Sequence, residues 1–219
     1  MAALLRHNKK LTHLDVRSNG IFGAAAHKLA SAVLASPSLA IFGGVPLKKL
    51  KEKTEEHLVL INEFLGPSEA RVLAGLLRQK SMRLTSLNLD RNQILSEGVR
   101  ALAEALHTNT GLTDLKINDN GTDGEAAPAL AKMLTMNTTL RELNVGGNRL
   151  GKEGGGLIAD ALAVNKTLTR FLALGVKFPP QDLERLRRVR DTRVEGVDQP
   201  LEVKVASLDS VGMSARASP

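Results

Sequence analysis

The chain has 219 residues, 42% of them hydrophobic, and is long enough to bury one sizeable core. Its net charge of +7 favours only weak attraction to acidic partners, and the lack of Trp and Tyr disfavours a nucleic-acid groove lined with stacking rings. The absence of Cys excludes disulfides, thiolate metal sites and cysteine nucleophiles, and it favours a cytoplasmic location. No stretch approaches the roughly 20 apolar residues that span a bilayer, and the N-terminus lacks the apolar stretch of a signal peptide, so we expect a soluble protein.

A repeated unit with a period of 28 first appears at 11–38 and recurs at 84–111, 112–139 and 140–167. Each copy opens with L-x-x-L-x-Φ-x-x-N, in which Φ is aliphatic, and the two-residue spacing of its apolar positions predicts a short strand. The second half of each copy places apolar residues at i, i+3, i+4 and i+7, which predicts a helix. Where the strand ends, buried backbone is expected to bond to the motif asparagines, which are Asn19, Asn92, Asn120 and Asn148.

Strands and helices that alternate at a fixed period must form two layers, and the wider helical layer bends the stack. We therefore predict an α/β solenoid over residues 1–190, a curved arc with parallel strands on the concave side and helices on the convex side. The copies resemble the ribonuclease-inhibitor type of leucine-rich repeat, which also occurs in innate-immune receptors and in the activator of the Ran GTPase. The resemblance covers residues 4–174 and implies a scaffold that binds other proteins.

Residues 4–11 match the end of a repeat, as at 105–112, so residue 1 is expected to lie inside the helix of an incomplete repeat. A solenoid needs a polar cap at each end. An uncapped start therefore indicates a fragment, a truncated gene model or an end that docks onto something else. The exposed first strand is also a pairing hazard and offers a route to self-association.

Residues 39–83 interrupt the period. A strand is expected at 58–60 and a helix at 70–77, with Glu63 where the motif Asn belongs. Upstream, a further strand is expected at 39–42, followed by a lysine-rich loop in place of a helix. We interpret this segment as an irregular repeat without a helix inside a continuous arc, and the alternative is a hinge between two sub-arcs.

The regular repeats also carry expected helix ends. Ser96 is a predicted N-cap, and Thr122 has capping-box spacing to Glu125. Pro128 predicts that its helix either starts late, near Glu125, or is kinked. The residues expected to end helices in the left-handed region are Asn109, Asn137 and Asn165.

The repeats are expected to end with a last strand at 168–173, because Val176 replaces the motif Asn and two prolines follow. A C-terminal capping helix is predicted at about 181–190, with Leu183 and Leu186 covering the last layer. Residues 191–219 lack periodicity and are predicted to be a poorly ordered tail.

The chain contains no dinucleotide, phosphate-loop, metalloprotease or nucleophile-elbow pattern. His13 and His57 share a strand position, but an intervening strand is expected to separate them, so no metal site is predicted. The five arginines at 185–193 are diluted by acidic residues and fit a solvated cap better than a nucleic-acid site. We therefore predict no catalytic residue, no cofactor and no nucleic-acid partner.

What remains is the surface formed by the outward strand positions, which are the third, fifth and seventh of each motif. These positions carry both charge signs and one apolar pair, which favours recognition of another protein rather than a phosphate track. They must be solvated in any solenoid, so many of them could also be spacers. The predicted protein-binding residues of this concave face are His13, Asp15, Arg17, His57, Val59, Ile61, Ser86, Asn88, Asp90, Asp114, Lys116, Asn118, Glu142, Asn144 and Arg170.

The leading hypothesis is a protein-binding scaffold or adaptor that catalyses nothing. One alternative is a GTPase activator that resembles the Ran activator, but no functional residue of that family is matched and the long acidic C-terminal run is missing. Another is the detached sensor region of an NLR-type immune receptor. The fold alone does not decide among them.

Overall fold

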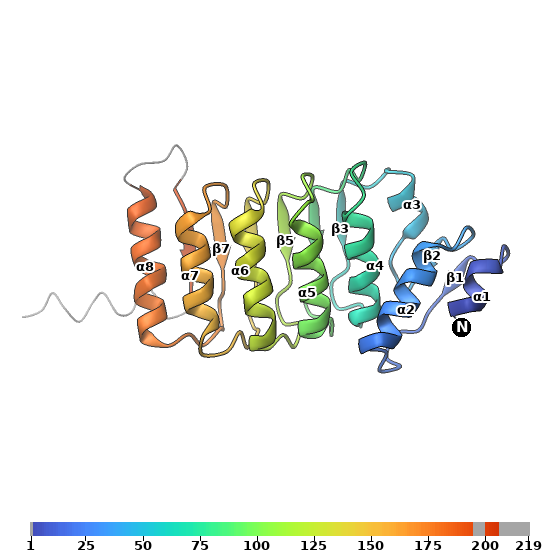
Figure 1. The fold of residues 1–219 in the computed structure, drawn as a ribbon, viewed down its shortest axis with the longest axis horizontal. Coiled ribbons are helices and arrows are strands. Elements are labelled where there is room, and N and C mark those ends of the chain that lie inside the picture. Colours follow the sequence, from blue (N-terminus) through green and yellow to red (C-terminus); the bar gives the residue numbers. More distant parts are fainter. Residues whose placement is uncertain (1, 195–199, 206–219) are drawn as a thin grey trace, which may run out of the picture.

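The computed structural model describes residues 2–194 and 200–205. Helices and strands alternate along the chain and separate into two layers, with the helices on one side of the parallel strands (Figure 1). The predicted α/β leucine-rich-repeat solenoid is therefore confirmed. In the described part of the chain, no helix is long and apolar enough to cross a membrane.

The strands are β1 (His13–Leu14), β2 (Ile41–Phe42), β3 (His57–Val59), β4 (Ser86–Asn88), β5 (Asp114–Lys116), β6 (Glu142–Asn144), β7 (Arg170–Leu172) and β8 (Glu202–Lys204). The helices are α1 (Ala2–His7), α2 (Gly23–Leu34), α3 (Leu47–Lys51), α4 (Pro67–Leu77), α5 (Leu95–Leu106), α6 (Ala127–Met136, preceded by the 3-10 turn η1, Gly124–Ala126), α7 (Gly154–Val164) and α8 (Pro180–Val194).

The period of the sequence appears directly in the strand register. β4 to β7 pair in parallel, and the residues that open these strands, Ser86, Asp114, Glu142 and Arg170, follow one another across the sheet. The central residue of each strand is buried, whereas its two neighbours face the other way and remain at least partly exposed. Equal repeats follow equal paths, so residues at equivalent positions form rows across the strand layer.

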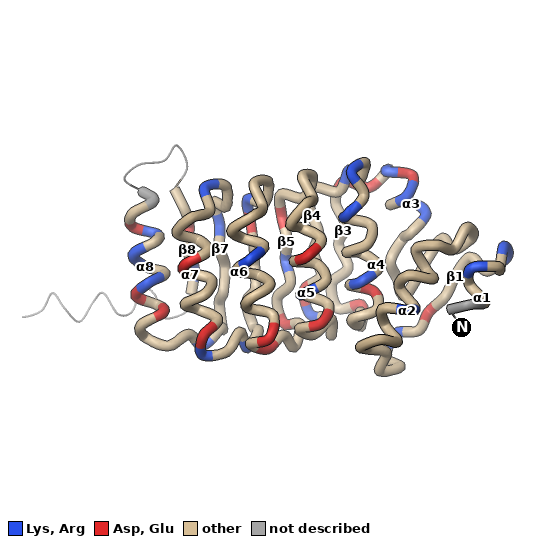
Figure 2. Tube along the Cα trace, viewed as in Figure 1, with Lys and Arg blue, Asp and Glu red and all other residues tan. Residues whose placement is uncertain are grey.

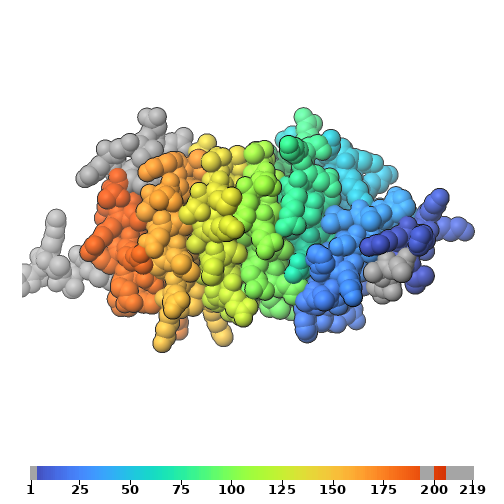
Figure 3. All heavy atoms as spheres, viewed as in Figure 1, coloured from blue at the N-terminus to red at the C-terminus, as the bar shows by residue number. Residues whose placement is uncertain are grey.

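The buried side chains form one hydrophobic core that extends from Leu5 to Val205. It contains the central residues of the strands and the apolar faces of the helices, in the layered arrangement that the aliphatic composition favours. In the space-filling view, the N-terminal third packs against the following repeats on the visible face (Figure 3). The helical layer therefore continues where the sequence period is broken.

The motif asparagines form a buried ladder where the strands end. Asn148 donates to the carbonyl oxygens of Ile117, Val145 and Gly146 at 2.8–3.2 Å, and its Oδ1 accepts from the backbone N–H groups of Asn120 and Thr122. Asn92 and Asn120 likewise bond to backbone of their own repeat and of the preceding one. The predicted role is therefore confirmed for Asn92, Asn120 and Asn148, but not for Asn19, whose side chain is exposed and donates to Val16 and Arg17 of its own repeat.

A second asparagine ladder follows the helices. The prediction that Asn137 and Asn165 end helices in the left-handed region is wrong, because both have extended backbones, and Asn109 is also absent from the residues with positive φ. Asn137 donates to the Leu106 carbonyl oxygen at 2.7 Å, and its Oδ1 accepts from the N–H groups of Thr139 and Leu140. These side chains tie a helix end to the preceding repeat.

The N-terminal residues form a repeat end. The side chain of Asn8 accepts from the backbone N–H groups of Lys10 and Leu11 at 2.8 and 2.7 Å, as Asn109 accepts from Gly111 and Leu112. This confirms the match between residues 4–11 and 105–112.

Pro128 occupies the first turn of α6, where the missing N–H costs nothing, so the late start of this helix is confirmed. The prediction that Ser96 caps α5 is wrong, because Ser96 lies inside the helix. Its hydroxyl instead donates to the carboxylate of Asp123, which accepts the N–H of Glu125 at the start of η1. A side-chain contact between repeats thus replaces the expected local cap.

The irregular segment contains both expected strands, but it breaks the sheet. β1 and β2 form a two-stranded sheet, and β3 begins a separate sheet of six strands. The predicted continuous arc is therefore wrong for the strand layer, and the predicted absence of a helix is also wrong, because α3 supplies a short one. This helix has only five residues because the interval between Ile41 and His57 is short.

The reason for the break lies in the turn after β2. The N–H of Phe42 donates to the Val45 carbonyl at 3.0 Å, and the N–H of Val45 donates back to the Phe42 carbonyl at 2.8 Å. Gly43 and Gly44 have φ of +50° and +83°, which permits this tight reversal. Val45 therefore uses the outer edge of β2, to which β3 would otherwise bond.

At the other end, Leu183 and Leu186 are buried as expected of the predicted capping helix. The predicted tail is wrong for residues 191–194, which continue α8, and for residues 202–204, which form β8 and pair with β7. Residues 201–205 alternate buried apolar and more exposed charged side chains, a strand pattern that we missed. Residues 195–199 and 206–219 lie outside the described part of the chain.

Candidate functional site: the strand face

The candidate site is the outward side of the strands, called here the strand face. Twelve of the fifteen predicted residues lie on or directly after β3–β7, where the parallel register brings them into rows. The other three, His13, Asp15 and Arg17, belong to β1 and its turn. Because β2 and β3 do not pair, the structure divides the predicted face into two parts.

The β5–β8 end of the strand face is an ion-pair network that spans two neighbouring rows. Glu142 contacts Lys116 at 3.6 Å and Arg170 at 3.0 Å, and Arg170 also reaches Glu202 at 2.7 Å. Lys204 closes the series on Glu202 at 2.6 Å. Hydrogen bonds from Lys204 and Arg170 hold the pKa of Glu202 below its usual value. The network gives the β5–β8 end alternating charges in a defined geometry.

The middle of the face is polar and held by local hydrogen bonds. The Asn88 side chain accepts from the N–H of Asp90 at 3.0 Å, and the Asp90 carboxylate accepts from the N–H of Asn118 at 2.8 Å. Asn144 accepts from Gly146 in the same manner as Asn88. These half-buried side chains are ordered before any partner arrives, which lowers the entropic cost of binding.

The β3 end of the face is apolar. Val59 and Ile61 are 62% and 41% exposed, and Phe64 in the following turn is 57% exposed. His57 is exposed beside them, in register with Ser86. The strand face therefore changes from apolar at β3 to ionic at β5–β8.

Arg17 joins the two parts of the face. It donates to both carboxylate oxygens of Asp15 and reaches the Glu63 carbonyl at 2.9 Å and carboxylate at 3.1 Å. The hydrogen bonds from Arg17 lower the pKa of Asp15 to about 2. Glu63, which stands in place of a motif Asn, thus bonds across the break in the sheet.

Several residues of this face were missed. Leu172 and Leu174 occupy the fifth and seventh positions of the last motif, and Leu174 is 53% exposed. The rule that the third, fifth and seventh positions of each motif face outward, called here the position rule, predicts both. Glu202 and Lys204 required recognition of β8, for which only the alternation of residues 201–205 gave a signal.

No group of three or more potential metal ligands gathers in the described residues. His13 pairs in register with Ile41, and His57 with Ser86, in different sheets. The clusters of lysines on α3 and arginines on α8 lie at opposite ends of the molecule, near acidic residues (Figure 2). The charge pattern of the described residues therefore does not form one continuous basic track.

The comparisons with known proteins agree with the fold. A family model described as leucine-rich repeat matches residues 7–30, 80–103 and 137–159. A structure of leiomodin-1 actin-binding site 2 is similar at 21% identity with a TM-score of 0.55, over 73% of this chain and 94% of that chain. The tropomodulin C-terminal domain of Caenorhabditis elegans is similar at 18% identity and a TM-score of 0.56, over 65% and 87% of the two chains. No curated protein matches.

Proposed function

Because this chain is a leucine-rich-repeat protein, we propose that it binds another protein through the strand face and acts as a scaffold or adaptor without catalysis. The fifteen residues predicted from the sequence, extended by Leu172, Leu174, Glu202 and Lys204, form the proposed surface. A cytoplasmic location, expected from the lack of cysteine, is part of the proposal.

The observation that carries the proposal is the arrangement of the strand face. It presents an ordered ion-pair network at β5–β8, fixed polar side chains in the middle and exposed apolar side chains at β3. Apolar anchors beside complementary charges are what a protein interface needs for affinity and orientation. The strands hold these groups at a spacing of roughly 4.8 Å, which favours an extended macromolecular partner over a small molecule.

Actin is the first partner to test, because leiomodin-1, one of the similar structures, is named for an actin-binding site. The identity to that chain is 21%, so the similarity supplies the candidate and not its contacts. The full chain would be titrated with monomeric actin and sedimented with filamentous actin. Saturable binding supports actin as the partner, and no binding in either form removes actin from the proposal.

The general proposal is tested by placing a photo-crosslinking amino acid at Asn88 or Asn144 on the strand face, or at Lys132 on α6 as a control. All three residues belong to equivalent repeats, and the Lys132 side chain faces solvent on the helical layer. In cell extract we expect a discrete protein adduct from the strand-face positions only. Adducts that form at Lys132 and not at Asn88 or Asn144 contradict the proposal.

The charge reversal Lys116→Glu together with Arg170→Glu then tests the ion-pair network. We expect it to weaken binding of the captured partner by about tenfold or more. The matched control is Arg78→Glu with Lys132→Glu on the helical layer, which has the same net charge change. Equal loss from both pairs would mean that only net charge, and not the strand face, matters.

A further inference from the structure

A pocket of about 300 Å³ lies at the break in the sheet, beside the strand face, with which it shares Arg17. Its walls are the turn after β1 and the segments that lead into α4 and α5. These segments meet because α3 is short, so that α2 packs directly on α4 and the first repeat approaches the third. The pocket is therefore a product of the irregular repeat.

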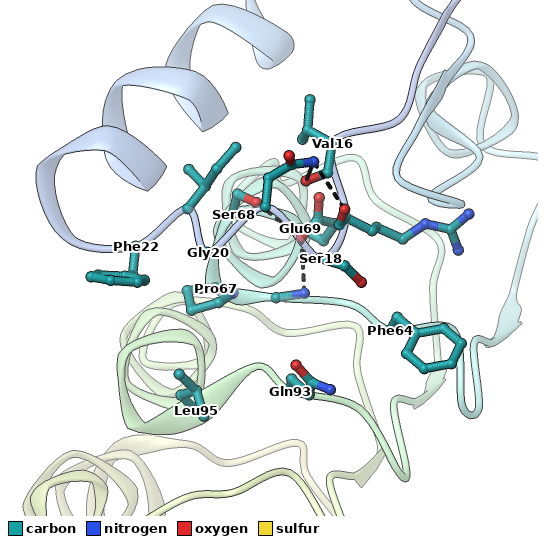
Figure 4. Close-up of a pocket in the computed structure, with 14 residues that line it drawn as sticks. Val16, Ser18, Gly20, Phe22, Phe64, Pro67, Ser68, Glu69, Gln93 and Leu95 are labelled. Atoms are coloured by element: carbon teal, nitrogen blue, oxygen red, sulfur yellow. Dashed lines mark hydrogen bonds between the residues drawn. The ribbon is translucent and has the colours of Figure 1, made fainter.

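The mouth of the pocket is apolar and exposed. Phe22 and Phe64 lie on opposite sides of it, with Pro67 and Leu95 between them (Figure 4). Phe22 is 63% exposed, Phe64 57% and Leu95 41%. A concave, mainly apolar site of this size accommodates one or two side chains rather than a large ligand.

Two of these apolar residues have strained backbones. Phe64 has φ of +55° and Leu95 has φ of +54°, a left-handed region that bulky L-residues adopt only at an energetic cost. Both side chains are nevertheless held in solvent at the pocket mouth. Neither contributes to the buried core that would offset this cost.

The surroundings of the pocket carry an excess of negative charge. Arg17 and Glu69 line it, and the Arg17 guanidinium is already bonded to the carboxylates of Asp15 and Glu63. Glu69 is buried, with Oε2 accepting from the Gly66 N–H and the Ser68 hydroxyl. Its Oε1 has no hydrogen-bond partner among the described residues. The surroundings of the pocket thus contain three carboxylates, of Asp15, Glu63 and Glu69, and one guanidinium, of Arg17.

We propose that this pocket takes an apolar side chain of a protein partner, presented on a segment with a basic residue beside that anchor. The apolar mouth accepts the anchor, and the exposed part of the Glu63 carboxylate pairs with the neighbouring Lys or Arg. This site shares Arg17 with the strand face but is lined mainly by other residues, so it can be present whether or not the strand-face proposal holds.

The probe is an amidated, acetylated octapeptide with a central Lys-Leu-Phe-Lys sequence between Gly-Ser flanks, titrated into the ¹⁵N-labelled full chain. Companion peptides replace both Lys by Glu or by Gln, or replace Leu-Phe by Ala-Ala. We expect saturable shifts of the backbone amides of Gly20, Gly66 and Gln93, with the Lys peptide bound about tenfold more tightly than the Glu peptide. Shifts confined to β4–β7, or no saturable shift, would overturn the proposal.

The variant Phe64→Ser removes an exposed side chain and should weaken the Lys peptide by about tenfold. Its matched control is Leu174→Ser, an equally exposed apolar residue at the far end of the strand face, with an expected change under about twofold. Thermal unfolding of both variants checks that each is folded. Equal weakening by the two variants contradicts a specific pocket.

The proposed ion pair between Glu63 and the basic residue of the partner is tested with Glu63→Gln. This variant should bind the Lys peptide more weakly and the Gln peptide with unchanged affinity.

A separate measurement follows the same backbone amides while the unliganded chain is diluted. Concentration-dependent shifts at Gly20 and Gly66 would show that a second copy occupies the pocket, and this outcome overturns the proposal of a different partner. Unchanged positions on dilution support it.

Discussion

The sheet from β3 to β8 and the N-terminal segment from β1 to α3 contain the same kinds of residue, but they differ in how their repeats are joined. From β4 to β7 the repeats are equal in length, and side-chain and backbone hydrogen bonds run to the next repeat. In the N-terminal segment, the paired positions of β1 and β2 are separated by the same number of residues as in the regular repeats. The interval from β2 to β3 is little more than half of that repeat length. The difference shows that the sheet continues where the repeats keep their length, and that it ends where a shortened repeat turns back at Gly43 and Gly44 and Val45 bonds to the outer edge of β2.

Two asparagines at equivalent motif positions also differ between these two regions. Asn148 is buried and bonds to two repeats, whereas Asn19 is exposed and donates only to Val16 and Arg17 of its own repeat. The same motif residue thus bonds to two repeats after β6 and to one repeat after β1, among the described residues.

The largest expected effect follows from this contrast. Asn148→Ala should lower the free energy of unfolding by about 3 kcal/mol, because several buried backbone groups lose their partners. Asn19→Ala should cost about 0.5 kcal/mol, since water replaces its bonds. Urea denaturation of both variants measures the difference. Similar losses at the two positions would contradict the claim that the N-terminal repeat is less tightly tied.

A smaller effect is expected from the link across the break. Arg17→Ala removes the contacts to Asp15 and Glu63 and should lower the free energy of unfolding by about 1 kcal/mol. The expected loss is no larger because the side chain is partly solvated, which weakens its ion pairs. Hydrogen exchange should accelerate at β1 and β2 and stay unchanged at β5. The control Arg170→Ala removes a more exposed guanidinium and should lower stability by less than Arg17→Ala does. Uniform acceleration in all strands after Arg17→Ala would show that the two sheets unfold as one unit.

The buried carboxyl at the break should make stability depend on pH. Burial, with a smaller effect of the Asp15 charge, raises the pKa of Glu69 above its usual value of 4.5. The folded chain therefore favours the protonated form, and the contribution of Glu69 to stability is lost as pH rises above 4.5 through the raised pKa. Glu69→Gln should accordingly raise the melting temperature at pH 7, and the gain should shrink towards pH 4.

Asp15 serves as a control of opposite sign, because Arg17 lowers its pKa from 3.8 to about 2. Its stabilising contribution is present above pH 3.8 and is lost as pH falls through 2. Asp15→Asn should therefore lower the melting temperature slightly at pH 7. If both variants shifted the melting temperature in the same direction, the assignment of the two carboxyls would be wrong.

The smallest effect is expected within the regular part. Glu142→Gln loosens the contacts to Lys116 and Arg170 and should cost about 0.5 kcal/mol at low salt. This loss of stability should disappear near 1 M salt, where the Debye length is only roughly 3 Å and the charges are screened from one another. Glu104→Gln, which breaks the more exposed pair with Arg78, should change stability by less. A loss that persists in high salt would indicate a packing role for Glu142.

Most of the regular fold was predictable because each repeat carries its own signals. The strand motif, the helix face and Pro128 act within one or two turns of chain, and the structure confirms them. The asparagines after the helices were misinterpreted because an αL cap and a ladder bond use the same residue type. Only the position of the neighbouring repeat distinguishes the two roles.

The candidate site was predictable to the same extent. The position rule placed residues from Ser86 to Arg170 on one face, because a strict period converts sequence position into a row. It could not show that Glu142 joins two cations, or that β8 supplies Glu202, since these contacts depend on side chains from four strands.

The sequence by itself determined the period, the alternation of strand and helix and the polar character of the strand face, since local backbone preference and apolar spacing are written into each copy of the repeat. The tertiary structure alone decided where the sheet breaks, which carboxylates Arg17 joins and that a pocket opens beside Glu69. Those features arise where α2 packs on α4 past a short helix. Contacts between segments far apart in the chain, such as that of Arg17 with Glu63, have no local signature in the sequence.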